Sequence, residues 1–470
     1  MSNKLLGKVS VHPVKSFFVH MLTRDISLQD AILDLLDNSV DGIQRSASNK
    51  VLEKKKPYDG YWAKLLLSED GFSIEDNCGG IPWENHEYAF RLGRANEDII
   101  KGRRTVGTYG IGMKRAIFKI GSECIISTHS KDQSYRVEFS EKWLTDENLW
   151  DIDALEIPES KIFGTKIEVS VVNDAVKVEF ASDVFLNSFR DAIATHYAYI
   201  IQKGFKVAVN GREVKPNSVG LLFQNINQKK GDDIRPFIYE ATHDGVDVFL
   251  AVGLTAPPPS KDEADQSLEN YQEKYSSAEA GWTVICNDRT VLYCDKTAVT
   301  GWGVSGVPQF HTQFIAISGI AVFTSDHPDR LPTTTTKRGI NASSSLYMHV
   351  RDKMIEGMKL FTQYTNLWKT KELVTESRSR LKDVATVELE RLREYASGLS
   401  FATTRGAVKG KQYKPDLPRP VVTKTAAKIS FTRPLKEIKK VSLYLFETAN
   451  KEPREVGEKC FEQILEEAVQ

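Results

Sequence analysis

Residues 31–42 read AILDLLDNSVDG, and this stretch decides the fold because polar side chains recur at a helical spacing within an apolar run. On a helical wheel of about 100° per residue, Asp34, Asn38 and Asp41 fall within roughly 60° of one another, with Asp37 at the margin. The stretch therefore predicts a mostly buried helix with one narrow acidic stripe. The stripe is either a solvated polar face or the lining of a cavity that holds a metal ion, and these twelve residues alone leave both interpretations open.

The composition sets only loose limits on function. A chain of 470 residues is expected to form two or three domains. Lys plus Arg equals Asp plus Glu at 63 each, so no overall charge attracts nucleic acid or a membrane. The five cysteines form no C-x-x-C pair, which argues for reduced thiols and against a disulfide framework or a zinc site. No run approaches the ~18 apolar residues of a membrane span, and no signal peptide is evident, so we expect a cytoplasmic protein without a membrane partner.

The pattern along the chain predicts successive segments. After the acidic helix, AKLLLSED (63–70) and GFSIEDN (71–77) alternate like two paired strands, and further strands and helices complete a mixed α/β layer. A strand-rich segment follows, with hairpin signals at Asn210-Gly211 and around Asn287. Residues 401–440 contain 11 Lys and Arg against 2 Asp and Glu, with four prolines, which is typical of a linker. The expected division is 1–175 for the first domain, 176–342 for the second, 343–400 for a helical segment, 401–440 for the basic linker and 441–470 for a C-terminal helix.

A glycine-rich loop stands before a predicted helix in VGTYGIGMKRA (106–116). Free backbone N–H groups at the entry to a helix favour a phosphate. The loop is not a Walker A motif, because a methionine separates the last glycine from Lys114 and an arginine replaces the required hydroxyl. The spacing is also wrong for a Rossmann fingerprint. The stretch is either a phosphate cradle of another type, or a lid hinge or helix-entry turn.

The segment IEDNCGGIP (74–82) places a carboxylate at the end of a predicted strand. The side chain of Asp76 can accept a hydrogen bond from an adenine amino group, while the bare backbone of Gly79 and Gly80 lets a flat ring approach. The alternative is an ordinary turn. Farther along, the Thr165 hydroxyl either supports Asp76 or belongs to an ordinary strand threonine.

Taken in this order, these stretches resemble the GHKL family of ATPases, which includes gyrase B subunits, heat-shock chaperone ATPases, MutL-type mismatch-repair proteins and histidine kinases. The resemblance is greatest to MORC-type members, through DLLDNSVDG and GTYGIGMK, and covers about residues 20–175, with a weaker match to about 340. It implies an α+β fold: a Bergerat-type α/β sandwich, followed by a strand-rich α/β transducer-like domain of the ribosomal S5 type and a helical C-terminal region. ATP and Mg²⁺ would bind between the helical layer and a lid at 84–106.

The resemblance also implies roles for individual residues. Asn38 would be the Mg²⁺ ligand, and Asp34 would orient the water that attacks the γ-phosphate. The remaining nucleotide-binding residues would be Asp76 at the adenine, with Gly80 and Thr165 beside it, and Gly107, Gly110, Gly112 and Lys114 at the phosphates. The chain departs from the family pattern twice. Asp34 replaces the usual Glu, which predicts either slow hydrolysis or the need for a relayed water, and Cys78 replaces the first glycine of the D-x-G-x-G adenine motif.

In gyrase B and MutL-type proteins the second domain sends a lysine back to the γ-phosphate. The loop RLPTTTTKRGINASS (330–344) lies where the resemblance predicts the loop with this lysine. Lys337 is the candidate for the γ-phosphate contact, and Arg338 is the alternative candidate. The alternative is an exposed basic turn. In those proteins ATP binding also brings two protomers together, so we expect a homodimer with ATP. The apolar stretch SFFVHML (16–22) either packs inside its own domain or forms the docking strap of the partner.

Three functional classes stay open within this family. The first is an ATP-gated clamp or switch that acts on DNA or a DNA-bound partner, with 401–440 as the DNA-binding segment. The second is a chaperone-like clamp on protein clients or other protein subunits, with the helical segment 343–397 as the platform. The third, a histidine-type protein kinase, is disfavoured because no phosphoacceptor helix fits in the roughly 20 residues before the ATPase core.

Overall fold

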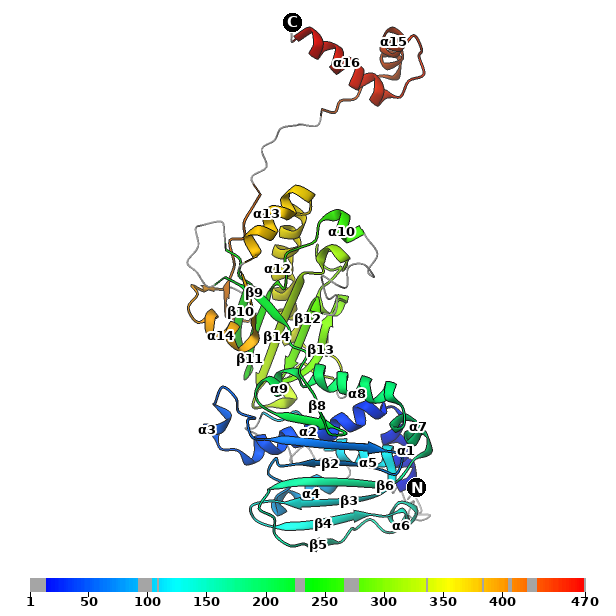
Figure 1. Ribbon diagram of the computed structural model, residues 1–470, viewed down its shortest axis with the longest axis vertical. Helices are drawn as coiled ribbons and strands as arrows, with labels where there is room; N and C mark the ends of the chain where they lie inside the picture. Colours follow the sequence, from blue (N-terminus) through cyan, green and yellow to red (C-terminus); the bar gives the residue numbers. More distant parts are fainter. Residues whose placement is uncertain are drawn as a thin grey trace, which may run out of the picture. The chain divides into compact units, whose positions relative to one another are not determined.

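The computed structural model describes residues 14–91, 104–107, 110–224, 233–265, 279–334, 337–382, 384–404, 408–420 and 429–468. The chain forms two compact units, residues 1–420 and residues 421–470. The fold is α+β, as predicted, with a separate sheet at the centre of each half of the first unit (Figure 1).

The first sheet has eight strands. Adjacent strands in it are antiparallel, except for the parallel pair β1 and β7. Burial alternates along β1, so one face of the sheet is covered and the other faces solvent. In spatial order the strands are β5 (Ala154–Glu156), β4 (Ser134–Phe139), β3 (Gly121–His129), β6 (Gly164–Val172), β2 (Gly71–Asp76), β1 (Trp62–Ser68), β7 (Lys206–Val209) and β8 (Arg212–Glu213).

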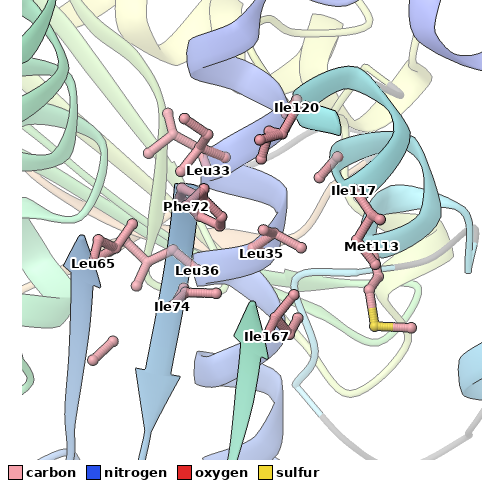
Figure 2. Close-up of a cluster of buried hydrophobic side chains, with 14 of the residues drawn as sticks. Leu33, Leu35, Leu36, Leu65, Phe72, Ile74, Met113, Ile117, Ile120 and Ile167 are labelled. Atoms are coloured by element: carbon pink, nitrogen blue, oxygen red, sulfur yellow. The ribbon is translucent and has the colours of Figure 1, made fainter. Parts of the chain in front are cut away.

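Helix α2 (Leu28–Ser46) lies over the covered face of this sheet. Ser27 begins the helix by accepting a hydrogen bond from the Asp30 backbone N–H, at 3.1 Å. Figure 2 shows leucines of α2 meeting side chains of the strands, with α5 (Gly112–Ile120) beside them. Each such leucine or isoleucine stabilises the fold by about 1.5–3 kcal/mol when fully buried. The residues labelled there are Leu33, Leu35, Leu36, Leu65, Phe72, Ile74, Met113, Ile117, Ile120 and Ile167.

The core of the first domain continues past the boundary that the sequence placed at 175. Strands β7 and β8 complete the first sheet, and Val214 still belongs to its hydrophobic core. The segment before them is helical rather than strand-rich. The other helices of this domain are α1 (Lys15–Arg24), α3 (Asn49–Leu52), α4 (His86–Phe90), α6 (Glu141–Thr145), α7 (Asp174–Phe180), α8 (Asp183–His196) and α9 (Ala198–Gln202).

Helix α1 is anchored to its own domain at its first residue. The ammonium group of Lys15 donates to the carbonyl oxygens of Trp143 and Asp146, at 2.7 and 2.6 Å, and the side chain is fully buried. Farther along the helix, Phe17 and Met21 are 63% and 45% exposed. The apolar stretch 16–22 is thus partly attached to its own domain and partly available to a partner.

The second half of the first unit, called the second domain below, is built on a sheet of seven strands. Helix α12 (Ser345–Leu367) packs on the central strands of this sheet. The opposite face is covered by the two-stranded sheet of β9 (Gly220–Phe223) and β15 (Ala385–Glu388) together with α14 (Leu389–Ala396). In spatial order the seven strands are β13 (Arg289–Asp295), β12 (Gly281–Cys286), β14 (Ile317–Ser325), β11 (Val246–Leu254), β10 (Phe237–His243), β17 (Gly410–Tyr413) and β16 (Ala402–Thr403). Helices α10 (Lys261–Asp265) and α13 (Lys371–Leu381) complete this half of the unit.

The region expected to be a basic linker, 401–440, contains regular structure. Strand β17 pairs with β10 and β16 pairs with β17, because an edge strand satisfies the backbone groups of even a short lysine-containing segment. Residues 405–407 and 421–428 of this region lie outside the described residues. The second unit forms two helices, α15 (Leu435–Phe446) and α16 (Pro453–Ala468), where the sequence suggested one.

Candidate nucleotide-binding site

A cavity of about 360 Å³ lies between α2, strands β2 and β6, and the loop that enters α5. One residue of the second domain, Lys337, also reaches it. Every site residue predicted from the sequence lines this cavity except Gly80. Those that do are Asp34, Asn38, Asp76, Gly107, Gly110, Gly112, Lys114, Thr165 and Lys337.

The acidic stripe of α2 faces this cavity. Asp34, Asn38 and Asp41 all line it, as the helical wheel groups them. Asp37, at the margin of the stripe, is buried instead against the second domain, where it accepts hydrogen bonds from Arg289 at 3.0 Å and from Lys337 at 2.7 Å. Burial alone would raise the pKa of Asp37, but these two cations hold the pKa at about 2. The polar residues of α2 therefore face two places: Asp34, Asn38 and Asp41 face the cavity, and Asp37 faces the second domain.

Asp34, the residue predicted to orient water, lies between two cations. Arg115 of α5 donates to one of its carboxylate oxygens, and the ammonium group of Lys337 is 3.5 Å from the other. The Asp34 side chain is only 7% exposed. In this conformation the carboxylate is occupied by cations of its own chain.

Asp41 fixes the start of the glycine loop. Its two carboxylate oxygens accept hydrogen bonds from the backbone N–H groups of Val106 and Gly107, at 2.6 and 2.8 Å. Burial raises the pKa of Asp41 to about 6, although Lys337 and the two amide donors limit the rise. A methyl group at Gly107 would stand 2.8 Å from Asp41 Oδ2, so a larger residue there would have to displace the carboxylate that holds the loop.

Asn38 is the polar residue of the stripe that has no partner among the described residues. Among the residues that the structure describes, none forms a hydrogen bond or other polar contact with its side chain, which lines the cavity. Within the same residues, no group of three or more His, Cys, Asp or Glu side chains is arranged to hold a metal. An amide oxygen facing a polar cavity fits a Mg²⁺ ion whose other ligands are phosphate oxygens and water.

The other end of the cavity is built around Asp76. One carboxylate oxygen accepts from the backbone N–H groups of Cys78 and Thr165, at 2.9 and 3.2 Å, and the other accepts from the Ser39 hydroxyl at 2.7 Å. Burial raises the pKa of this carboxyl, while the three donors oppose the rise. The predicted support from Thr165 thus comes from its backbone, and its hydroxyl lies 3.3 Å from that of Thr128.

The turn after Asp76 accommodates the cysteine that departs from the family pattern. Cys78 is buried, and its N–H supplies one of the bonds to Asp76. The two residues that follow adopt the left-handed conformation, with φ of +99° at Gly79 and +68° at Gly80. A methyl group at Gly80 would lie 2.2 Å from the His129 carbonyl oxygen, so this glycine shapes the turn from outside the cavity.

Lys114, on the first turn of α5, is buried beside the glycine loop. Its ammonium group donates to the carbonyl oxygen of Ala89 at 2.8 Å and also to that of Gly110. Lys114 therefore holds the start of the predicted lid against the glycine loop. Residues 92–103 of that lid lie outside the described residues.

The structure distinguishes the two basic candidates of the second domain by position. Lys337, with φ of +56°, lines the cavity and contacts the acidic helix. Arg338 instead contacts Asp30 and, at 2.9 Å, the Nε2 atom of His196. Lys337 itself is not on an exposed turn, since its side chain is only 13% exposed.

Sequence reasoning missed several residues that order the site. Ser39 lies inside the stretch DLLDNSVDG, and its place beside Asn38 on α2 was a usable signal. Arg289 and Tyr197 gave none, because they reach Asp37 only through the tertiary fold. The Tyr197 hydroxyl donates to Asp37 at 2.5 Å, and the guanidinium of Arg289 lies 4.3 Å from the Tyr197 ring centre.

Comparison with known proteins agrees with this geometry. Residues 26–172 match the family model described as histidine kinase-, DNA gyrase B-, and HSP90-like ATPase. These residues form a GHKL-type ATPase domain. The chain is also similar to the protein MICRORCHIDIA 6 of Arabidopsis thaliana, with 33% identity over 106 residues, which are 22% of this chain and 14% of that protein. The predicted likeness to the GHKL family and to its MORC-type members is confirmed. Among the described residues, no helix has the length and apolar character needed to cross a bilayer.

Proposed function

We propose that this chain is a Mg²⁺-dependent ATP-binding and ATP-hydrolysing conformational switch that closes as a dimer clamp. The observation that carries the proposal is that one cavity is lined by the acidic helix of the GHKL domain and by Lys337 of the second domain. A ligand in this cavity touches both domains at once. Binding and release of a triphosphate can then change how the two domains contact each other.

The cavity has chemically different ends that suit the two halves of ATP. The end at Asp76 offers a buried carboxylate to an adenine amino group. The opposite end offers the glycine loop and the ammonium group of Lys337 to the phosphates. Asn38, between them on the helix, is the side chain that would hold Mg²⁺, which when bound neutralises phosphate charge.

Asp34 is the residue proposed to act on water. Its carboxylate can orient a water molecule and accept its proton once Arg115 and Lys337 have turned to the phosphates. Because Asp is one methylene shorter than Glu, the water is held farther from the γ-phosphate, and hydrolysis is slow.

Lys337 is proposed to report the γ-phosphate to the second domain. Its ammonium group is bound by Asp37 at 2.7 Å. A γ-phosphate would compete for that cation, and hydrolysis would return it to the carboxylate. The contact between the two domains thereby depends on the nucleotide.

The proposed target is DNA or a DNA-bound partner. The supporting features are the basic composition of 401–440 and the similarity to a MORC-type protein. The alternative is a chaperone-like clamp on protein clients, for which the long helix α12 and its neighbours supply a helical platform.

One titration tests the core of this proposal. Binding of a fluorescent ATP analogue and release of phosphate are measured on the full chain, with and without Mg²⁺ and with and without duplex DNA. The proposal expects Mg²⁺-dependent binding, slow turnover and a change in turnover when DNA is added. A chain that binds no nucleotide under these conditions would refute the ATPase function, and turnover that responds to unfolded protein but not to DNA would favour the chaperone-like alternative.

A further inference from the structure

The turn between β12 and β13 is a second place where the second domain contacts the GHKL domain. It is separate in sequence from the loop that carries Lys337. Three consecutive side chains at this turn each contact a different part of the first domain. The contacts are those of Asn287 with Thr105, of Asp288 with Tyr58 and Lys203, and of Arg289 with Asp37.

Asn287 has one set of hydrogen bonds within its own domain and one outside it. Its side chain is buried, with Oδ1 accepting from the Ser325 N–H at 2.9 Å and Nδ2 donating to the Ser325 carbonyl at 3.0 Å. The same Nδ2 group donates to the carbonyl oxygen of Thr105 at 3.1 Å. Only this last bond crosses to the GHKL domain.

Thr105 immediately precedes the glycine loop of the cavity. The next two backbone N–H groups, those of Val106 and Gly107, donate to Asp41. The short segment 105–107 is therefore held on one side by the acidic helix and on the other by Asn287. Its Gly107 lines the cavity at the end assigned to phosphate.

We infer that Asn287 is a positioning residue of the nucleotide site, supplied by the second domain. It sets the place of the glycine-loop segment 105–107, and it connects nucleotide binding to the β12–β13 hairpin by a route that does not use Lys337. This inference rests on the proposed function, since it assigns Asn287 to the same cavity. By linkage, if the hairpin contact strengthens nucleotide binding, nucleotide binding strengthens the hairpin contact by the same free energy.

The chain contains a matched control for this residue. Asn210, at the β7–β8 turn, has φ of +49° against +44° for Asn287. Its Oδ1 accepts from the Leu67 N–H at 2.8 Å, and its Nδ2 donates to the Leu67 carbonyl at 3.0 Å. Asn210 thus repeats the bonds of Asn287 to a neighbouring strand without a bond to the cavity segment. Glycine adopts positive φ without strain, so Asn→Gly removes the two bonds to the neighbouring strand at both turns and the bond to Thr105 only at Asn287.

The experiment compares Asn287→Gly with Asn210→Gly in the full chain. Both variants lose two bonds to a neighbouring strand, so both should lower the melting temperature. Only Asn287→Gly should weaken binding of a non-hydrolysable ATP analogue with Mg²⁺, by about 3- to 10-fold, the effect of one buried hydrogen bond. Asn210→Gly should stay within about twofold of the unmodified chain.

Hydrogen exchange supplies a measurement that would not change with nucleotide if Asn287 only stabilised its own domain. Adding the analogue should increase amide protection in residues 281–295 of the unmodified chain and of Asn210→Gly, but not of Asn287→Gly. If Asn287→Gly does not fold, Asn287→Asp with its control Asn210→Asp repeats the comparison, since aspartate keeps the acceptor and loses the amide donor.

Two failures are distinguishable. If the unmodified chain binds no analogue, the proposed function is wrong, and the inference falls with it. If the unmodified chain binds the analogue, and Asn287→Gly binds it equally well with the same protection of 281–295, then only the inference about Asn287 is overturned.

Discussion

Two polar residues one helical turn apart on α2 have different expected roles, and substitution separates them. Asn38→Ala should abolish nucleotide binding. Among the described residues, the other side chains of the stripe already have protein partners, so Asn38 is the one placed to bind a metal–phosphate complex. Asp34→Ala should keep binding and lower turnover by at least about 100-fold, because it removes the proposed proton acceptor and leaves Asn38 and Asp76 in place. Analogue affinity and phosphate release measured on both variants check this, with Asp191→Ala on exposed α8 as the control. Unchanged hydrolysis in Asp34→Ala would contradict its role as a base.

The imidazole of His196 makes the first unit sensitive to acid. Its Nδ1 atom lies 2.8 Å from the Thr290 carbonyl oxygen, and its Nε2 faces Arg338 at 2.9 Å. Burial, together with the charges of Arg289 and Arg338, lowers the pKa of His196 to about 3. The unfolded chain titrates near 6.5, so it binds a proton that the native state does not bind. The stabilisation is complete above about pH 6.5 and is lost as pH falls toward 3, at up to about 1.4 kcal/mol per pH unit.

This pH dependence is measurable by urea denaturation between pH 7 and pH 4. His196→Gln should flatten the decrease in unfolding free energy, because glutamine takes up no proton in this range. His20→Gln, at an exposed position of α1, should leave the slope unchanged. Equal slopes in all three proteins would show that other groups cause the acid sensitivity.

The positions of the stripe residues were predictable because helical spacing is local. Asp34, Asn38 and Asp41 share a face at about 100° per residue whatever lies around them. The partners of Asp37 were not predictable, since Arg289 and Lys337 are far along the chain and reach it only through the fold of the second domain. The same limit applies to Thr165, whose residue type suggested a hydroxyl contact while the strand register delivers the backbone N–H.

Long helices and strands with a clear hydrophobic period can be predicted from the sequence, whereas short edge strands cannot. Helix α2 and the hairpin of β12 and β13 were expected from their spacing and turn residues. Strands β16 and β17 were not, because two to four residues with lysine and glycine carry little strand preference. The structure of β17 comes from pairing with β10, whose edge it covers, and β16 pairs in turn with β17. The core beyond residue 175 was missed because its last strands return to the first sheet after three helices.

The pairing of β17 decides how the basic segment can be tested. Deleting 401–440 would expose the edge of β10, so the charges must be removed in place. Replacing the exposed Lys414, Arg419 and Arg433 by glutamine should weaken DNA retention and reduce its salt dependence, because fewer counterions are released. Basal ATPase activity should stay within about twofold.

Filter binding of duplex DNA at several salt concentrations measures this effect. The control replaces three exposed lysines of the GHKL domain and the segment after it, Lys142, Lys161 and Lys215, by glutamine. If the two triple variants retain DNA equally, the basic segment is a solvated surface and the DNA site lies elsewhere or does not exist.

At the scale of the whole molecule, the first unit joins two sheets through a set of buried charges. Asp37 lies between Arg289 and Lys337 of the second domain, and its neighbour Asn38 faces the cavity. Removing one member of such a buried group leaves an unpaired charge, which is strongly destabilising. A ligand that attracts Lys337 therefore acts on the domain contact directly, and the two domains must respond together.

Dimerisation is the last consequence expected of this coupling. The chain should be a monomer or a weak dimer alone and a stable dimer with a non-hydrolysable ATP analogue and Mg²⁺, because a ligand that binds the closed dimer better shifts the population toward it. The exposed Phe17 and Met21 on α1 supply apolar surface for such docking. Lys337→Ala should reduce the shift more than it weakens nucleotide binding, because Asn38, Asp76 and the glycine loop remain. Arg338→Ala, at the next residue, removes contacts with Asp30 and His196 and should reduce the shift less. Light scattering across a concentration series measures the mass. An unchanged mass with saturating analogue would exclude the clamp and leave a monomeric switch, in which Lys337 reports the nucleotide only to its own second domain.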